Sequence, residues 1–111
     1  MEIVEKKQDD IDIFQLTGRL DSNTSPELEK KINVSLEAGS TSLIIDFENL
    51  DYISSAGLRV ILKATKDLKR SEGKLVLCAM QDYVKEVFEI SGFDSFLPIV
   101  GTMDEAFTEV K

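Results

Sequence analysis

Histidine is absent from the 111 residues of this sequence. Catalysis by Ser-His-Asp or Cys-His arrangements is therefore excluded, and so are the common zinc sites. The single cysteine, Cys78, excludes an internal disulfide. It stands in the apolar run Leu75–Ala79, where we expect a buried small side chain rather than a reactive thiol.

Basic residues are scarce relative to acidic ones. The chain has 13 Lys and Arg against 21 Asp and Glu, which gives a net charge of −8. Binding to nucleic acid or to an anionic membrane surface requires clustered positive charge, so neither is expected. No apolar run approaches the ~20 residues of a membrane span, and residues 1–10 are too charged for a signal peptide. The sequence predicts a cytoplasmic protein, and its acidity favours a protein partner with a basic face.

The motifs of nucleotide-binding loops and the Gly-x-Ser-x-Gly nucleophile elbow are missing as well. We expect no cofactor, no metal ion and no enzymatic activity. Ser55 as a catalytic nucleophile is the enzymatic alternative, although no activating base is visible. Asp46 interrupts a buried run, and we expect it to accept hydrogen bonds from the chain that follows. The alternative role for Asp46 is that of a phosphoacceptor or metal ligand.

The residues that are present predict one domain, residues 1–111, because 42% hydrophobic and 31% charged residues are typical of a globular chain. Alternating or uninterrupted apolar runs predict five strands, at 2–5, 11–17, 43–47, 74–80 and 96–100. Apolar residues at helical spacing predict four helices, which begin at Thr24 or Ser25, after Ile53, at Asp82 and at Thr102. Thr24 with Glu27 and Thr102 with Glu105 fit the capping-box pattern.

This order of elements predicts an α/β fold, with a mixed, mostly parallel sheet of about five strands, four helices and an N-terminal antiparallel hairpin. Pro98 argues that the last strand lies at an edge of the sheet. Parallel strands end at one common edge, where ligands and partners usually meet such a sheet. That edge should gather the loops 18–23, 49–56 and 80–82, and so bring Asp21 close to Ser55.

The stretch Asp51–Arg59 follows the apolar run 43–47 and opens a helical pattern that continues to about Arg70. A serine at a helix start caps the helix, and the free backbone N–H groups and the helix dipole there also accommodate a phosphate. From the stretch alone, a helix cap is the simpler interpretation of Ser54 or Ser55. An exposed serine in this turn is also accessible to a kinase, and the added charge would alter docking to a partner.

Several segments of the chain resemble the STAS domain family. The similarity is carried by Asp46–Leu50 with Ile53–Leu58, by Leu16–Asp21, and by Val76–Ala79 with Ser91–Phe93. It covers nearly all of the chain, which looks most like a stand-alone bacterial anti-sigma factor antagonist.

This resemblance implies a phosphorylation switch. The unphosphorylated antagonist binds an anti-sigma factor that is also a serine kinase, and the sigma factor is thereby released for transcription. The kinase then phosphorylates a serine of the turn, the antagonist dissociates, and a serine phosphatase resets it.

Aligned on Gly57 and Leu58, the phosphorylated serine of the family falls on Ser55, and Ser54 is the alternative acceptor. Ser54 stands where the family usually has aspartate, and Ala56 replaces a second hydroxyl. Asp21 matches an acidic residue at the partner-facing edge. The partner-binding surface implied by the resemblance consists of Asp21, Ser22, Asn23, Ser54, Ser55, Ala56, Gly57, Leu58 and Arg59.

The missing aspartate keeps a second interpretation open. In it, the chain is a STAS-type module that senses a small ligand, or serves as a scaffold in a signalling complex, without phosphorylation.

Overall fold

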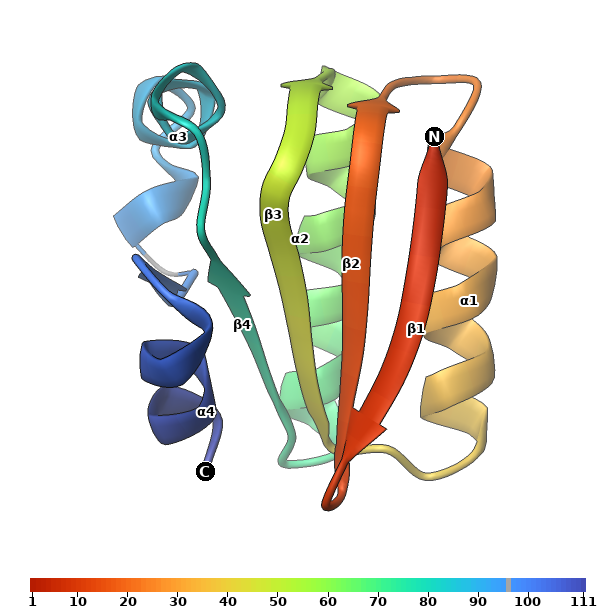
Figure 1. Cartoon of the computed structure of the whole chain (residues 1–111). Coiled ribbons are helices and arrows are strands. Elements are labelled where there is room, and N and C mark those ends of the chain that lie inside the picture. Colours follow the sequence, from red (N-terminus) through yellow and green to blue (C-terminus); the bar gives the residue numbers. More distant parts are fainter. Residues whose placement is uncertain (96) are drawn as a thin grey trace.

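A computed structural model describes residues 1–95 and 97–111 (Figure 1). Its elements in chain order are β1 (Glu2–Gln8), β2 (Ile11–Leu20), α1 (Ser25–Glu37), β3 (Ser42–Ile53), α2 (Ser55–Arg70), β4 (Lys74–Cys78), α3 (Asp82–Ile90), the 3₁₀ helix η1 (Phe93–Ser95), β5 (Ile99–Val100) and α4 (Met103–Val110). The predicted order of strands and long helices is confirmed. Phe96, with which the last predicted strand begins, lies outside the described residues.

The strands form one sheet in the order β1-β2-β3-β4-β5. β1 and β2 pair antiparallel, and every other pair is parallel. The predicted mixed α/β sheet with an N-terminal hairpin is therefore confirmed. β5 lies at one edge of the sheet, as Pro98 just before it indicated.

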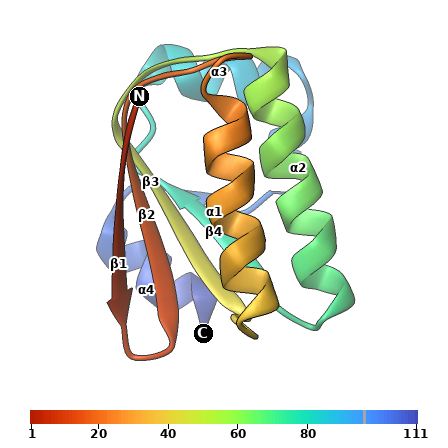
Figure 2. The ribbon, with the colours of Figure 1, turned by 90° about the vertical axis from the view of Figure 1, so that its right-hand side faces the viewer.

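Helices cover both faces of the sheet unequally, as Figure 2 shows: α1 and α2 lie on one face and α4 on the other. The alternation along β3 explains this arrangement, because Leu43, Ile45 and Phe47 join the core under α1, α2 and α3. Ile44 points the opposite way, into a smaller core under α4. Phe47 meets Phe88 of α3 edge to face, with ring centroids 6.0 Å apart.

Within the described residues, no helix has the length and hydrophobicity needed to cross a membrane.

Several predicted strand boundaries are wrong. β1 continues to Gln8 rather than ending at Glu5, because one side of an edge strand stays in water and tolerates charge. β2 and β3 run on to Leu20 and Ile53 because they pair with each other beyond the last residue of β4. Residues 18–20 and 49–53, predicted as loops, are therefore strand.

Of the two predicted capping patterns, the one at Thr102 is confirmed and the one at Thr24 is wrong. The Thr102 hydroxyl accepts the Glu105 N–H at 3.1 Å, so the cap of α4 is confirmed. The predicted capping box at α1 is wrong, because Thr24 makes no side-chain capping bond to that helix. Its hydroxyl instead serves the loop before the helix, as described below.

Candidate functional site

The serine turn, residues 54–58, lies where β2 and β3 end together. Leu20 and Ile53 are the last paired residues of these strands. The Ser54 N–H donates to the Leu20 carbonyl at 2.9 Å, so the turn is joined to the residue directly before Asp21. This contact confirms that the two segments meet at one edge of the sheet.

Ser54 and Ser55 have different roles at the start of α2. Ser54 is the N-cap residue, and its hydroxyl accepts the Gly57 N–H at the long distance of 3.4 Å. Ser55 is the first helical residue and is exposed. Its hydroxyl has no hydrogen-bond partner among the residues that the structure describes. The cap and the free hydroxyl are thus on separate serines.

Gly57 and Leu58 form the inner side of the turn. Gly57 is buried, and a Cβ there would stand 2.8 Å from Cγ of Leu20 and 2.9 Å from Cγ1 of Ile53. Only glycine lets α2 start this close to the ends of both strands. Leu58 is 8% exposed and belongs to the main core. Both residues shape the turn from inside, while Ser55 and Arg59 face solvent.

The loop before α1 is closed by its own polar groups. Oδ1 of Asp21 accepts the N–H groups of Asn23 at 3.0 Å and Thr24 at 3.1 Å. The Thr24 hydroxyl donates to the Arg19 carbonyl at 2.8 Å and accepts the Asp21 N–H at 2.9 Å. Ser25 donates its hydroxyl proton to the Asp21 carbonyl at 2.5 Å. Among the predicted partner-binding residues here, Ser22 and Asn23 are exposed and Asp21 is half-buried.

The pKa of Asp21 reflects opposing effects. Desolvation raises this pKa, but the hydrogen bonds from Asn23 and Thr24 and the charge of Arg19 outweigh it and hold it below its usual value. Nε of Arg19 lies 3.9 Å from Oδ2 of Asp21. Asp21 therefore carries its negative charge beside the serine turn at neutral pH.

Arg19 and Tyr52 form a contact that the sequence did not reveal. The two residues are paired across β2 and β3, and the Arg19 guanidinium carbon lies 4.2 Å from the centre of the Tyr52 ring. Tyr52 is 40% exposed, so the pair adds an aromatic and cationic surface next to Asp21. Predicting this pair from the sequence would require knowing that both strands continue to Leu20 and Ile53.

The third predicted loop, residues 80–82, does not reach the serines through any described contact. β4 ends at Cys78, and the side chain of Gln81 donates to the Glu48 carbonyl at 3.1 Å. This position lies five residues before the end of β3. The edge is therefore stepped, with β2 and β3 projecting beyond β4.

Asp46 and Cys78 are paired opposite each other in the sheet. Contacts within the fold explain the position of both side chains. Asp46 accepts hydrogen bonds from the Glu48 N–H at 3.0 Å and from Gln15 Nε2 at 3.4 Å, as expected for its structural role. Burial, with the charges of Asp46 and Glu48, raises the pKa of the Cys78 thiol to about 12. A thiol held neutral in this way is not a nucleophile.

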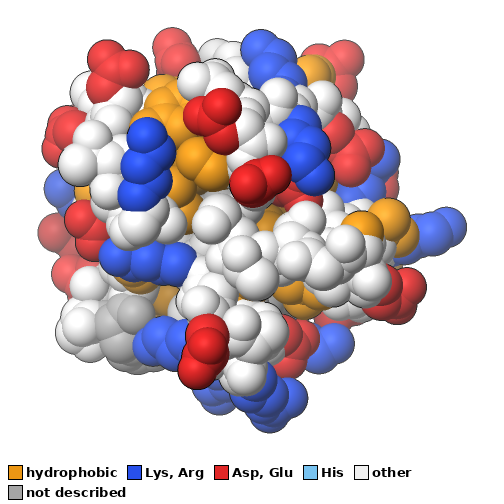
Figure 3. All heavy atoms as spheres, turned by 90° about the horizontal axis from the view of Figure 1, so that it is seen from below, with side chains coloured by type: hydrophobic (Ala, Val, Ile, Leu, Met, Phe, Trp, Pro, Cys, Tyr) orange, Lys and Arg blue, Asp and Glu red, His pale blue; other side chains and the backbone are white. Residues whose placement is uncertain are grey.

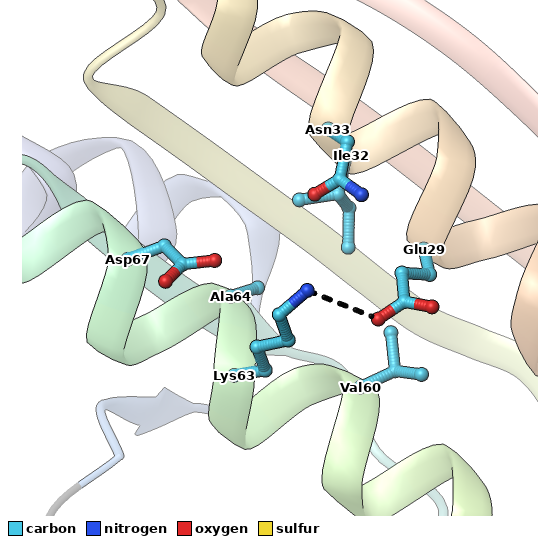
Figure 4. Close-up of a pocket in the computed structure, with 7 residues that line it drawn as sticks. All are labelled: Glu29, Ile32, Asn33, Val60, Lys63, Ala64 and Asp67. Carbon is cyan, nitrogen blue, oxygen red and sulfur yellow. Dashed lines mark hydrogen bonds and ion pairs between the residues drawn. The ribbon is translucent and has the colours of Figure 1, made fainter.

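A hollow between α1 and α2 lies apart from the serine turn (Figure 4). Ile32, Val60 and Ala64 line it, and Lys63 crosses its mouth to Glu29 at 3.4 Å. The packing of two amphipathic helices, with an ion pair across their contact, is enough to explain this shallow apolar hollow.

The end of the molecule opposite the serine turn carries both signs of charge side by side (Figure 3).

The α/β sheet and the serine turn at its edge define the class of protein. The sequence model of the STAS domain matches residues 2–106. The chain belongs to the STAS domain family.

Particular relatives agree with this assignment. BtrV of Bordetella bronchiseptica, named as a candidate anti-sigma factor antagonist, is 39% identical over 111 residues, which is 100% of this chain and 96% of that protein. A candidate anti-sigma factor antagonist of Thermotoga maritima has the same fold, with a TM-score of 0.93 at 24% identity over 97% of this chain and 93% of that one.

The Bacillus anti-sigma factor antagonist SpoIIAA has been solved without and with its phosphoryl group. Its phosphorylated form matches with a TM-score of 0.78 and 23% identity, over 99% of this chain and 100% of that one.

Proposed function

We propose that this protein is an anti-sigma factor antagonist controlled by phosphorylation of Ser55. In its unphosphorylated form it binds an anti-sigma factor that is also a serine kinase, in the cytoplasm, and so frees a sigma factor. It acts as a regulatory binding partner rather than as an enzyme. The names of BtrV and SpoIIAA support this function, as does the existence of a phosphorylated form of SpoIIAA.

The observation that carries the proposal is the unused hydroxyl of Ser55 at the exposed start of α2. The first N–H groups of a helix have no intrahelical acceptor, and the helix dipole is positive there. Ser54 already caps the helix through Gly57. A phosphate on Ser55 therefore adds about 1.5 to 2 negative charges without removing a bond on which the fold depends.

The exposed residues around Ser55 are the docking surface in this proposal. They are Ser22, Asn23 and Arg59, with the half-buried Asp21, Ser54 and Ala56 between them. A phosphate at the centre of this surface blocks the close approach of the partner to the backbone at the start of α2. The kinase and a serine phosphatase then set the fraction of molecules able to bind.

The test is incubation of the purified chain with the candidate anti-sigma kinase and ATP, followed by mass spectrometry of the modified peptide. We expect Ser55→Ala to lose the phosphate and Ser54→Ala, the matched control one residue away, to keep it. Phosphorylation of Ser55→Ala to the wild-type extent would mean that the acceptor is wrong. We also expect Ser55→Asp to bind the kinase more weakly than the wild type, in a titration followed by calorimetry, with unchanged stability.

The STAS-type sensing or scaffold module is the second candidate, and Ser54 at the usual aspartate position favours it. It predicts that no anti-sigma kinase binds or modifies the wild-type protein. It also predicts that Ser55→Asp leaves the association with its signalling complex unchanged.

A further inference from the structure

Strand β1 is an open edge of the sheet. It ends the strand order, and it pairs with β2 over all seven of its residues without a register shift. Six of the seven are exposed, among them the large apolar side chain of Val4 at 39%. An edge strand presents a row of free backbone N–H and C=O groups that can pair with another strand. In Figure 1, α4 lies over the β4 side of the front face and leaves β1 uncovered.

The side chains of β1 alternate between two faces. Glu2, Val4 and Lys6 lie opposite Thr17, Gln15 and Ile13 of β2. Because Ile13 belongs to the core under α4, these three β1 residues are on the α4 side of the sheet. Neither Glu2 nor Lys6 has an ion-pair partner among the described residues.

Charge usually protects an edge strand from pairing, and lysine is the commonest device. A strand carrying a single sign of charge would repel a copy of itself. β1 instead places Glu2 and Lys6 four residues apart on one face, with Val4 midway between them. Such a strand is complementary to itself when a copy runs in the opposite direction.

We propose that β1 pairs antiparallel with β1 of a second copy of this chain, centred on Val4, to form a continuous ten-stranded sheet. Val4 then faces the partner's Val4, Glu2 faces the partner's Lys6, and Lys6 faces the partner's Glu2. Two opposite-charge pairs thus flank one apolar pair on the same face. The register centred on Glu5 would place two carboxylates directly opposite each other, which destabilises a strand pair.

The other face of the edge carries α1. Lys31 of α1 reaches down to Glu5 at 3.0 Å, so the charge of Glu5 is already balanced. A groove between α1 and β1 is lined by Glu5, Glu27, Lys30, Lys31 and Val34, which carry both signs of charge. Val34 is 59% exposed. Figure 2 shows α1 and α2 on one face of the sheet, so an antiparallel pairing of β1 with its copy places both copies of α1 on the same face.

Charge reversal tests the register. Sedimentation velocity of the wild-type chain at about 10 to 500 µM is expected to show a monomer in exchange with a dimer. Glu2→Lys places lysine opposite lysine twice, and Lys6→Glu places glutamate opposite glutamate twice, so each raises the dissociation constant about tenfold or more. The double variant E2K/K6E restores the dimer. An equimolar mixture of the two single variants also restores it, because each heterodimer has two opposite-charge pairs.

The controls carry the same charge changes on α3, as Glu86→Lys and Lys85→Glu, both at exposed positions. They are expected to dimerise as the wild type does. A wild-type chain that stays monomeric over the whole range overturns the proposal. So does a dimer that the β1 reversals weaken no more than the α3 controls, or one that neither the double variant nor the mixture restores. None of these results depends on Ser55 or on the proposed function.

Discussion

The starts of α1 and α2 use the same residue types in opposite ways. Both follow the carboxyl ends of neighbouring strands, and both are rich in hydroxyl groups. At α1, the side chains of Asp21, Thr24 and Ser25 are all bonded within the loop. At α2, the hydroxyl of Ser54 makes one long bond and that of Ser55 makes none among the described residues. The first start is therefore held by side-chain hydrogen bonds, whereas the second leaves the exposed Ser55 hydroxyl without one among the described residues.

The largest effect is expected from Gly57→Ala, which would push α2 away from both strands. The new Cβ would stand within 3 Å of Leu20 and Ile53 carbons. We expect the free energy of unfolding to fall by about 2 kcal/mol, as for other overpacked sites. Alanine otherwise favours a helix over glycine by about 1 kcal/mol, so a loss would isolate the steric contact.

Urea denaturation measures this change. Gly101→Ala is the control, because a Cβ there meets only the side-chain carboxylate of Glu105, at 3.3 Å. Equal stability of the Gly57→Ala variant and the wild type would show that the close approach does not constrain the turn.

The next largest effect is expected at the α1 start, from Thr24→Val. The substitution keeps the shape of the side chain but removes the bonds to the Arg19 carbonyl and the Asp21 N–H. Loss of one partly buried and one exposed hydrogen bond should cost about 1 to 2 kcal/mol of unfolding free energy. Thr24→Ser keeps the hydroxyl and should retain most of the stability. If Val and Ser at this position are equally stable, the α1 loop is held by something other than this hydroxyl.

Much of this comparison could be read from local sequence. The apolar run Leu43–Phe47, interrupted only by Asp46, predicted a buried strand, and its side chains are buried. The apolar stripe predicted an amphipathic helix, and its residues are buried except for the half-buried Leu62: Leu58, Ile61, Leu62, Thr65 and Leu68. Ser54 and Ser55 were correctly placed at the start of that helix. These features depend on residues close together in the chain.

What the sequence could not reveal depends on distant partners. Asp51 was expected in the loop 49–56, yet it lies in β3 because the end of that strand pairs with β2. Thr24 matched a capping pattern, but a carbonyl five residues earlier takes its hydroxyl proton. Arg19 and Tyr52 meet only once the register is known. Pairing across the sheet outweighed local propensity in β3 and at Arg19 and Tyr52, whereas a nearby carbonyl did so at Thr24.

A smaller effect is expected from Ser54→Ala, which removes the cap of α2. Because the bond to the Gly57 N–H is 3.4 Å long, we expect a loss of about 0.5 to 1 kcal/mol, at the low end for an N-cap. Ser55→Ala is the matched control and should be within about 0.5 kcal/mol of wild type, as for an ordinary surface change. Thermal and urea denaturation test whether Ser54→Ala is less stable than Ser55→Ala. A larger loss at Ser55 would make it the structural serine and would remove the contrast between the two helix starts.

The smallest effect is expected from Asp21→Asn, which keeps an acceptor oxygen in the α1 loop and removes only the charge. The pKa of Asp21 is lowered in the folded state, so the ionised carboxylate stabilises the fold. This contribution is complete above the unfolded-state pKa of about 3.9 and is lost as the pH falls through the lower folded-state pKa. Wild type should therefore exceed Asp21→Asn in stability at pH 7, and the gap should close in acid. Urea denaturation of both proteins from pH 7 to about pH 2.5 measures the gap, because the other carboxylates titrate alike in both. A gap that stays constant over this range would mean that the loop is held by the geometry of its hydrogen bonds alone.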